Sequence, residues 1–160
     1  MNVSLIFEDG TQKSLQLEWK NAIDECETKK GNKILEIRFE YDTMINNMEL
    51  HRFSIIFESK EMFDNFVNSI KNNNVIPIKT ELCFYDKNGE HKEFEIGSKI
   101  EIINDNPEIT IKFLSNDLIL ENKKLTSVDV NFTNKIEFIQ IVEDAERLLY
   151  PKNLRQVDFR

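Results

Sequence analysis

The stretch Phe53–Phe63, which reads FSIIFESKEMF, decides the fold, and a similar stretch, VDVNFTNKIEF, recurs at Val128–Phe138. In both stretches apolar residues alternate over the first five positions, which is typical of a half-buried β-strand. A polar residue and a lysine follow, and the apolar spacing then changes to the three and four residues of an amphipathic helix. The chain therefore contains two similar junctions at which a strand leads into a helix.

Each junction leads into a helix with one apolar face. The spacing predicts a first helix over residues 60–71 and a second over 135–149. Ser59 is the predicted N-cap of the first helix, and either Asn134 or Thr133 caps the second. The residues predicted to face the core are Phe63, Phe66, Val67 and Ile70 in the first helix, and Phe138, Ile141, Val142, Ala145, Leu148 and Leu149 in the second.

Upstream of the junctions the two halves keep the same order of elements. Residues 35–39 correspond to residues 109–113, again with alternating apolar positions. Each half also opens with a predicted hairpin, whose turn is Asp9-Gly10 in the first half and Asn88-Gly89 in the second. The sequence thus predicts an α+β fold of two tandem diverged repeats. Each repeat is predicted to be an antiparallel β-sheet of about four strands closed by a C-terminal amphipathic helix.

The repeats are predicted to divide the chain at its asparagine-rich linker. Residues 1–75 form the first repeat, and residues 76–160 form the second repeat together with a C-terminal tail, 150–160. The linker is short, so the repeats are expected to pack together, either as one continuous sheet or as two sheets related by an approximate two-fold axis. The alternative is that two unrelated strand–helix junctions in an ordinary α+β chain have been aligned.

The connectors inside the two repeats differ. In the first repeat Trp19, Ala22, Ile23 and Cys26 fall at helical spacing and predict a short helix. In the second repeat, residues 100–107 favour a short strand followed by a turn. If the repeats share a core, such differences are where function is expected.

Composition limits the classes of partner. The chain has 160 residues and a net charge of −8, and both halves share the excess of acidic residues. Nucleic acid and membrane are therefore not expected as partners, because both select clustered lysine and arginine. The first residues resemble no signal peptide, and no apolar run reaches the roughly 20 residues that cross a bilayer. The sequence predicts a cytoplasmic protein.

No arrangement of residues points to catalysis. His51 and His91 lack the spacing of a metal-binding pair and are interpreted as surface imidazoles. Cys26 and Cys83 are interpreted as reduced thiols, since neither belongs to a Cys-x-x-Cys pair. The chain also lacks a glycine-rich phosphate loop and a nucleophile elbow. We therefore expect no enzyme activity, no cofactor and no metal site.

The candidate partner-binding residues are acidic clusters and an apolar tail. The clusters are interpreted either as solvated faces or as a docking surface for a basic protein, and the tail either folds back or offers a short motif to a partner. The candidate residues are Asp24, Glu25 and Glu27, then Glu143, Asp144 and Glu146, and finally Leu154 and Phe159 in the tail.

The function that this composition favours is a non-catalytic protein-binding module. Small acidic proteins of the toxin-immunity and phage anti-defence kind, which inhibit or antagonise a partner, have a similar composition. The excess of lysine over arginine and the many asparagines indicate an AT-rich genome, such as that of a bacterium or its phage. The alternative function is a structural or scaffold subunit that forms a homo-oligomer through exposed sheet edges. A small enzyme with an unrecognised site is the third hypothesis.

Overall fold

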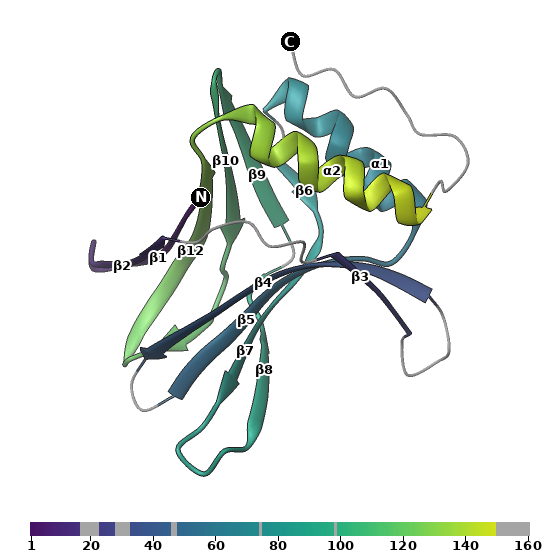
Figure 1. The fold of residues 1–160 in the computed structure, drawn as a ribbon. Coiled ribbons are helices and arrows are strands. Elements are labelled where there is room, and N and C mark those ends of the chain that lie inside the picture. The colour runs from purple at the N-terminus through teal and green to yellow at the C-terminus, as the bar shows by residue number, and fades with distance from the viewer. Residues whose placement is uncertain (17–22, 28–32, 46–47, 74, 98, 150–160) are drawn as a thin grey trace.

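The computed structural model describes residues 1–16, 23–27, 33–45, 48–73, 75–97 and 99–149. Its strands form two antiparallel sheets, and two α-helices lie together at one end of the molecule (Figure 1). The predicted α+β class with antiparallel sheets is thereby confirmed.

The first sheet combines strands from both ends of the chain. Its order is β2 (Gln12–Gln16), β1 (Asn2–Phe7), β12 (Lys123–Phe132), β10 (Glu108–Leu114), β9 (Lys99–Asp105) and β6 (Val75–Pro77), and β11 (Ile119–Leu120) pairs with β12. The second sheet has the order β3 (Ile23–Glu27), β4 (Lys33–Ile45), β5 (Met48–Phe57), β7 (Lys79–Tyr85) and β8 (His91–Glu95).

The core lies between the apolar faces of the two sheets. Alternating residues point inward from each strand, as the burial of β1 and β10 illustrates. Phe53 of β5 and Phe113 of β10 are fully buried, and their rings meet edge to face with centroids 4.6 Å apart. This aromatic contact joins the two sheets directly.

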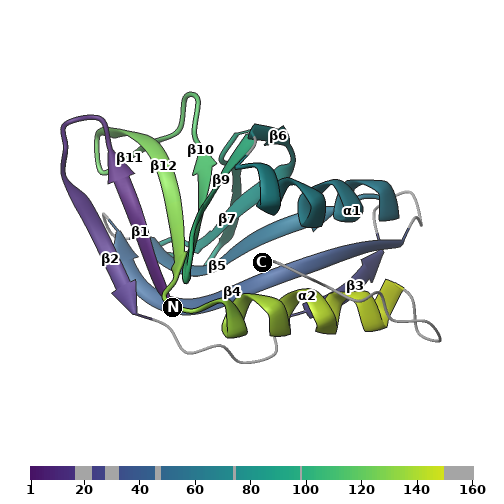
Figure 2. The same cartoon turned by 90° about the horizontal axis from the view of Figure 1, so that it is seen from above.

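The two helices are those that the sequence predicts. α1 spans Lys60–Ser69 and continues as the 3₁₀-helix η1 (Ile70–Asn72), and α2 spans Lys135–Leu149. The predicted core-facing positions are buried as far as Ala145, whereas Leu148 is 42% exposed and Leu149 is half-buried at the end of α2. The helices run in opposite directions, with β4 and β5 seen between them in Figure 2, and each contacts both sheets. The rings of Phe66 on α1 and Phe138 on α2 have centroids 5.9 Å apart. Neither of these two helices is long and apolar enough to cross a membrane.

The predicted N-caps are also present. The Ser59 hydroxyl accepts a hydrogen bond of 3.2 Å from the backbone N–H of Met62. The Asn134 side chain accepts one of 3.2 Å from the backbone N–H of Glu137, so Asn134 rather than Thr133 caps α2. Each cap satisfies one of the N–H groups that the first turn of a helix leaves without a partner.

Replacing Ser59 with alanine is expected to lower the free energy of unfolding by about 1 kcal/mol, because the cap hydrogen bond is lost. Urea denaturation followed by circular dichroism measures this loss. Ser59→Asp is the matched control, since aspartate caps as well as serine does. A loss of equal size in both variants would contradict a capping role for Ser59.

The sequence predicts that each half of the chain builds an antiparallel sheet from its own strands, and this prediction is wrong. The first hairpin, β1–β2, pairs with β12 of the second half, and the hairpin β7–β8 pairs with β5 of the first half. Alternation of apolar residues tells which face of a strand is buried but not which strand lies beside it. Each sheet therefore combines a hairpin from one half of the chain with strands from the other half.

Apart from this combination of the two halves, the two sheets match strand by strand. The order β2-β1-β12-β10-β9 in one corresponds to β8-β7-β5-β4-β3 in the other. Both sheets have a shift of strand register at the equivalent position. In the first sheet the shift lies between Ile6 and Phe7 of β1, and in the second sheet it lies opposite Cys83 and Phe84 of β7. The matching cross-strand rows are Leu5–Val128–Phe113 in the first sheet and Leu82–Phe53–Phe39 in the second.

The predicted structure is wrong for the connector of the first half and confirmed for the connector of the second half. Ile23 and Cys26, for which the spacing predicts a helix, lie in strand β3, while Trp19 and Ala22 lie outside the described residues. Pairing along β4 overrides the helical spacing, because β3 can satisfy its backbone groups at that edge. In the second connector, the predicted strand and turn are confirmed as β9 and the turn that follows it.

Candidate functional site

The segment after α1 turns the chain back along that helix. Asn73 adopts the left-handed conformation, with φ 52°, which asparagine tolerates better than most residues. Its side-chain oxygen accepts a hydrogen bond of 3.0 Å from the backbone N–H of Asn104 on β9. The Asn104 amide in turn donates to the Ile70 carbonyl at 3.5 Å. These bonds fix the turn to the sheet, and β6 consequently runs in contact with α1.

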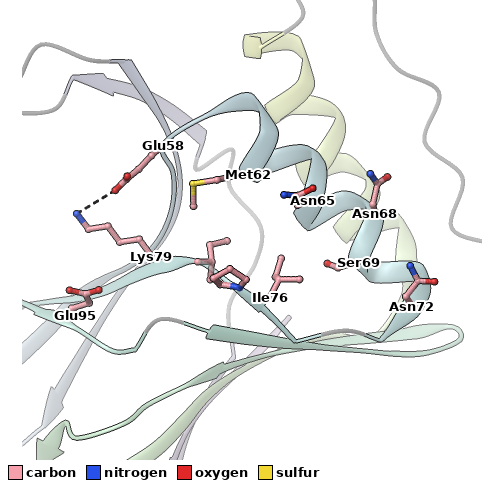
Figure 3. Close-up of a pocket in the computed structure, with 11 residues that line it drawn as sticks. Glu58, Met62, Asn65, Asn68, Ser69, Asn72, Ile76, Lys79 and Glu95 are labelled. Carbon is pink, nitrogen blue, oxygen red and sulfur yellow. Dashed lines mark ion pairs between the residues drawn. The ribbon is translucent and has the colours of Figure 1, made fainter.

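An open groove of about 680 Å³ lies between α1, β6 and the start of β7 (Figure 3). We call it the α1–β6 groove. Met62, Ile76 and Ile78 supply its apolar surface, and Asn65, Asn68 and Asn72 line it along the helix.

The three asparagines form one row on α1 and η1. Their spacing of three and four residues puts them on the same face of the helix, and all three are exposed. Within the described part of the chain, none of these side chains makes a hydrogen bond. Each amide offers both a donor and an acceptor. The row can therefore bind a partner that presents backbone N–H and C=O groups.

One end of the groove is acidic. Lys79 lies 3.9 Å from a carboxylate oxygen of Glu58 and 3.8 Å from one of Glu81, and is shared between them. Burial, together with the nearby Glu93 carboxylate, raises the pKa of Glu81. Glu95 also lines the groove and forms no ion pair with any described residue. This end therefore attracts a positive charge.

The strand that borders the groove is at the edge of its sheet. β6 pairs with β9 on one side and with no described strand on the other. An edge strand presents backbone groups to which a further chain can bind. Val75 at the start of β6 is 52% exposed. The groove thus combines apolar surface, amide side chains and a strand edge.

A second polar cluster covers the face of the β3–β8 sheet that points away from the core. Glu36 is buried there, accepts a hydrogen bond of 2.5 Å from the Ser54 hydroxyl and lies 3.0 Å from the Arg38 guanidinium. Arg52 Nε lies 3.8 Å from Glu36, and Arg52 Nη2 lies 3.3 Å from Cys83 Sγ. Burial raises the pKa of the Cys83 thiol, which Arg52 opposes.

The two histidines lie close together on this side of the molecule. The rings of His51 and His91 have centroids 5.1 Å apart, and His51 stacks on Tyr85 with centroids 4.1 Å apart. They are exposed or half-buried, as expected for surface imidazoles. Their spacing in the sequence does not indicate that they are neighbours.

The predicted partner-binding residues are only partly described. Asp24, Glu25 and Glu27 lie on β3, but their side chains are outside the described part of the chain, as are Leu154 and Phe159. β3 contacts α2, the helix that carries Glu143, Asp144 and Glu146.

The acidic residues of α2 have three different environments. Glu143 is exposed, whereas Asp144 accepts a hydrogen bond of 2.9 Å from Arg147. Glu146 is buried, with 1% of its surface exposed. Glu146 thus differs from the solvated side chain that the sequence predicts, and binding of a partner by this cluster stays a prediction. The position of Glu146, four residues after Val142, puts it near the apolar face of the helix.

Comparison of the chain with known protein families, with curated proteins and with solved structures finds no match.

Proposed function

We propose that this protein is a non-catalytic binding module that holds an extended segment of a partner protein in the α1–β6 groove. The observation that carries the proposal is the row of three exposed asparagines, which lines the groove together with apolar residues beside an edge strand. A small-molecule site is more enclosed than this and converges on a few polar groups. Here the polar groups form a line, which suits a linear ligand.

The size of the row agrees with a short extended chain. From Asn65 to Asn72 the helix rises about 10 Å, which is the length of about three residues of a β-strand. The apolar groove residues, such as Ile76, would contact alternate side chains of that segment. Glu95 at the acidic end favours a ligand with lysine or arginine at one end, in line with a basic partner.

The protein is proposed to act as an inhibitor or antagonist of its partner. Sequestering an extended segment prevents that segment from binding elsewhere, and this requires no catalytic residue. A scaffold role through sheet edges is the competing proposal. It predicts a closed oligomer in solution, whereas the binding proposal predicts that the groove stays accessible.

We also infer that the chain consists of two diverged copies of one unit, residues 1–75 and 76–160, which exchange their hairpins. Support comes from the matching strand orders, the equivalent cross-strand rows and the shared register shift. β6 follows α1 and η1, and the segment that follows α2 lies outside the described residues.

A peptide selection tests the groove. Wild-type protein, presented with a random peptide library, is expected to select extended apolar peptides with a basic residue at one end. The double variant Asn65→Ala/Asn68→Ala should bind them about tenfold more weakly, because each hydrogen bond contributes roughly 0.5–1.5 kcal/mol. Glu95→Gln should lose the preference for the basic residue. Fluorescence anisotropy with labelled peptides measures all three affinities.

The control is Asn116→Ala, which removes an exposed asparagine outside the groove. It should bind the selected peptides as tightly as wild type does. Equal affinity of the wild type and the double variant would contradict binding in the groove. A wild-type oligomer in which the groove is inaccessible to every peptide would support the scaffold role instead.

A further inference from the structure

The hairpin β7–β8 brings a thiol, an imidazole and a carboxylate together. The ligand atoms of Cys83, His91 and Glu93 all lie within 4.8 Å of one another. Cys83 is buried, whereas His91 and Glu93 are exposed. His91 Nδ1 lies 3.7 Å from Glu93 Oε1.

The register of the hairpin accounts for this arrangement. Cys83 pairs directly with Glu93 across the two strands. His91 precedes Glu93 by two residues on the same strand, so their side chains share a face. All three residues therefore project from paired strands, which hold their Cα atoms in place.

The turn of the hairpin is tightly hydrogen-bonded. Its backbone is closed by the Asp86 N–H, which donates to the Glu90 carbonyl at 2.9 Å. The Asp86 carboxylate also accepts hydrogen bonds of 2.9 Å from the backbone N–H groups of Asn88 and Glu90. A turn held in this way limits movement of β8 relative to β7. The three side chains are thus presented by a preorganised backbone.

We propose that Cys83, His91 and Glu93 bind a divalent zinc ion. Thiolate, imidazole and carboxylate are the three protein ligands that zinc uses, and such a mixed set favours zinc over magnesium or calcium. In a tetrahedral zinc site, neighbouring ligand atoms are about 3.5 Å apart. Rotation of the exposed His91 and Glu93 side chains can bring the ligands from their present separation to that distance. The fourth position is left for water or for a group from a partner.

Arg52 is the group that the ion must displace. Its Nη2 atom lies 3.3 Å from Cys83 Sγ and 3.7 Å from Glu93 Oε1, and so its positive charge occupies the place between two of the ligands. Arg52 has another anionic neighbour, since its Nε atom lies 3.8 Å from Glu36. When zinc binds, the guanidinium can remain beside Glu36 while the metal takes over its role between Cys83 and Glu93.

The probe is Co²⁺, which replaces zinc and reports sulfur ligation. The full chain titrated with Co²⁺ is expected to develop the near-ultraviolet absorption of a thiolate–cobalt bond, and stoichiometric Zn²⁺ should abolish it. Cys83→Ser should eliminate the band and weaken Zn²⁺ binding, measured by calorimetry, at least about a hundredfold. Glu93→Gln should keep the band and weaken Zn²⁺ binding about tenfold.

Glu90→Gln is the matched control, because it removes the same charge from the same hairpin without removing a proposed ligand. It should bind Co²⁺ and Zn²⁺ as the wild type does. Circular dichroism of each variant verifies that the fold is kept. The proposal would be overturned by a wild-type chain that gives no band, or by a Cys83→Ser chain that retains it, since Cys26 would then supply the sulfur.

Discussion

Replacing Phe53 with alanine is expected to lower the free energy of unfolding by about 3–5 kcal/mol. The Phe53 side chain is fully buried and stacks on Phe39 within its own sheet, with ring centroids 5.7 Å apart. It also meets Phe113 of the opposite sheet at 4.6 Å. The change removes a large buried side chain and leaves a cavity where the two sheets meet. Since domains have roughly 5–15 kcal/mol of stability in all, this is a large fraction.

Urea denaturation measures the loss as a fall in the midpoint with an unchanged slope. Phe94→Ala is the control, because Phe94 is only half-buried on strand β8 at the edge of its sheet and, among the described residues, contacts one ring, that of Phe84. It should cost clearly less than Phe53→Ala. Equal losses in the two variants would mean that Phe53 is not the centre of the contact between the sheets.

A double-mutant cycle isolates the contact itself. Phe53→Leu, Phe113→Leu and the double variant keep most of the apolar volume while they remove the aromatic pair. The two single losses should exceed the loss of the double variant by about 0.5–1.5 kcal/mol, which is the usual coupling of an edge-to-face pair. Strict additivity would mean that the rings contribute only by filling space.

The elements that the sequence predicts well are those whose signals are local. The change in apolar spacing after Phe57 marks where β5 ends, and the Ser59 cap marks where α1 begins. A cap and a helix stripe depend on residues within one or two turns of each other, so no knowledge of distant contacts is required. For the same reason the predicted turns at Gly10 and Gly89 are confirmed, and both glycines have a positive φ.

The pairing of strands depends on distant residues and was not predicted. Nothing in residues 2–7 distinguishes β12 from β5 as the neighbour of β1, because both offer the same apolar alternation. In the structure, Leu5 lies opposite Val128, and the equivalent Leu82 lies opposite Phe53. Sequence similarity between the halves makes both arrangements compatible with the local pattern. The exchange of hairpins is set by packing of the whole chain.

The sites were missed for different reasons. Asn65, Asn68 and Asn72 resemble a solvated helix face, and only the return of the chain along β6 turns that face into a groove. The cluster of Cys83, His91 and Glu93 on β7–β8 could have been predicted, because the predicted turn at Asn88-Gly89 pairs Cys83 with Glu93. The cysteine and the histidine are seen to lie close together only when the register of the hairpin is taken into account.

Cutting the chain between its halves is expected to abolish folding of each half alone. Fragment 1–74 would lack β7 and β12, which pair with β5 and β1 in the intact protein, and fragment 75–160 would lack the complementary partners. Each fragment would leave a central strand and one face of its helix without neighbours. We expect no cooperative unfolding transition from either fragment, but we expect their equimolar mixture to recover the circular dichroism of the whole chain.

The exchange of hairpins makes this prediction specific. If each half formed its own sheet, as the sequence alone predicts, the fragments would fold separately and associate weakly. A cooperative transition in fragment 1–74 as a monomer would therefore contradict the exchanged arrangement.

Introducing Phe113→Ala into fragment 75–160 adds a second test, because Phe53 is supplied by the other fragment. A loss of about 3–5 kcal/mol at that contact would weaken association of the fragments at least about a hundredfold. Unchanged association would mean that the contact between Phe53 and Phe113 does not hold the two halves together.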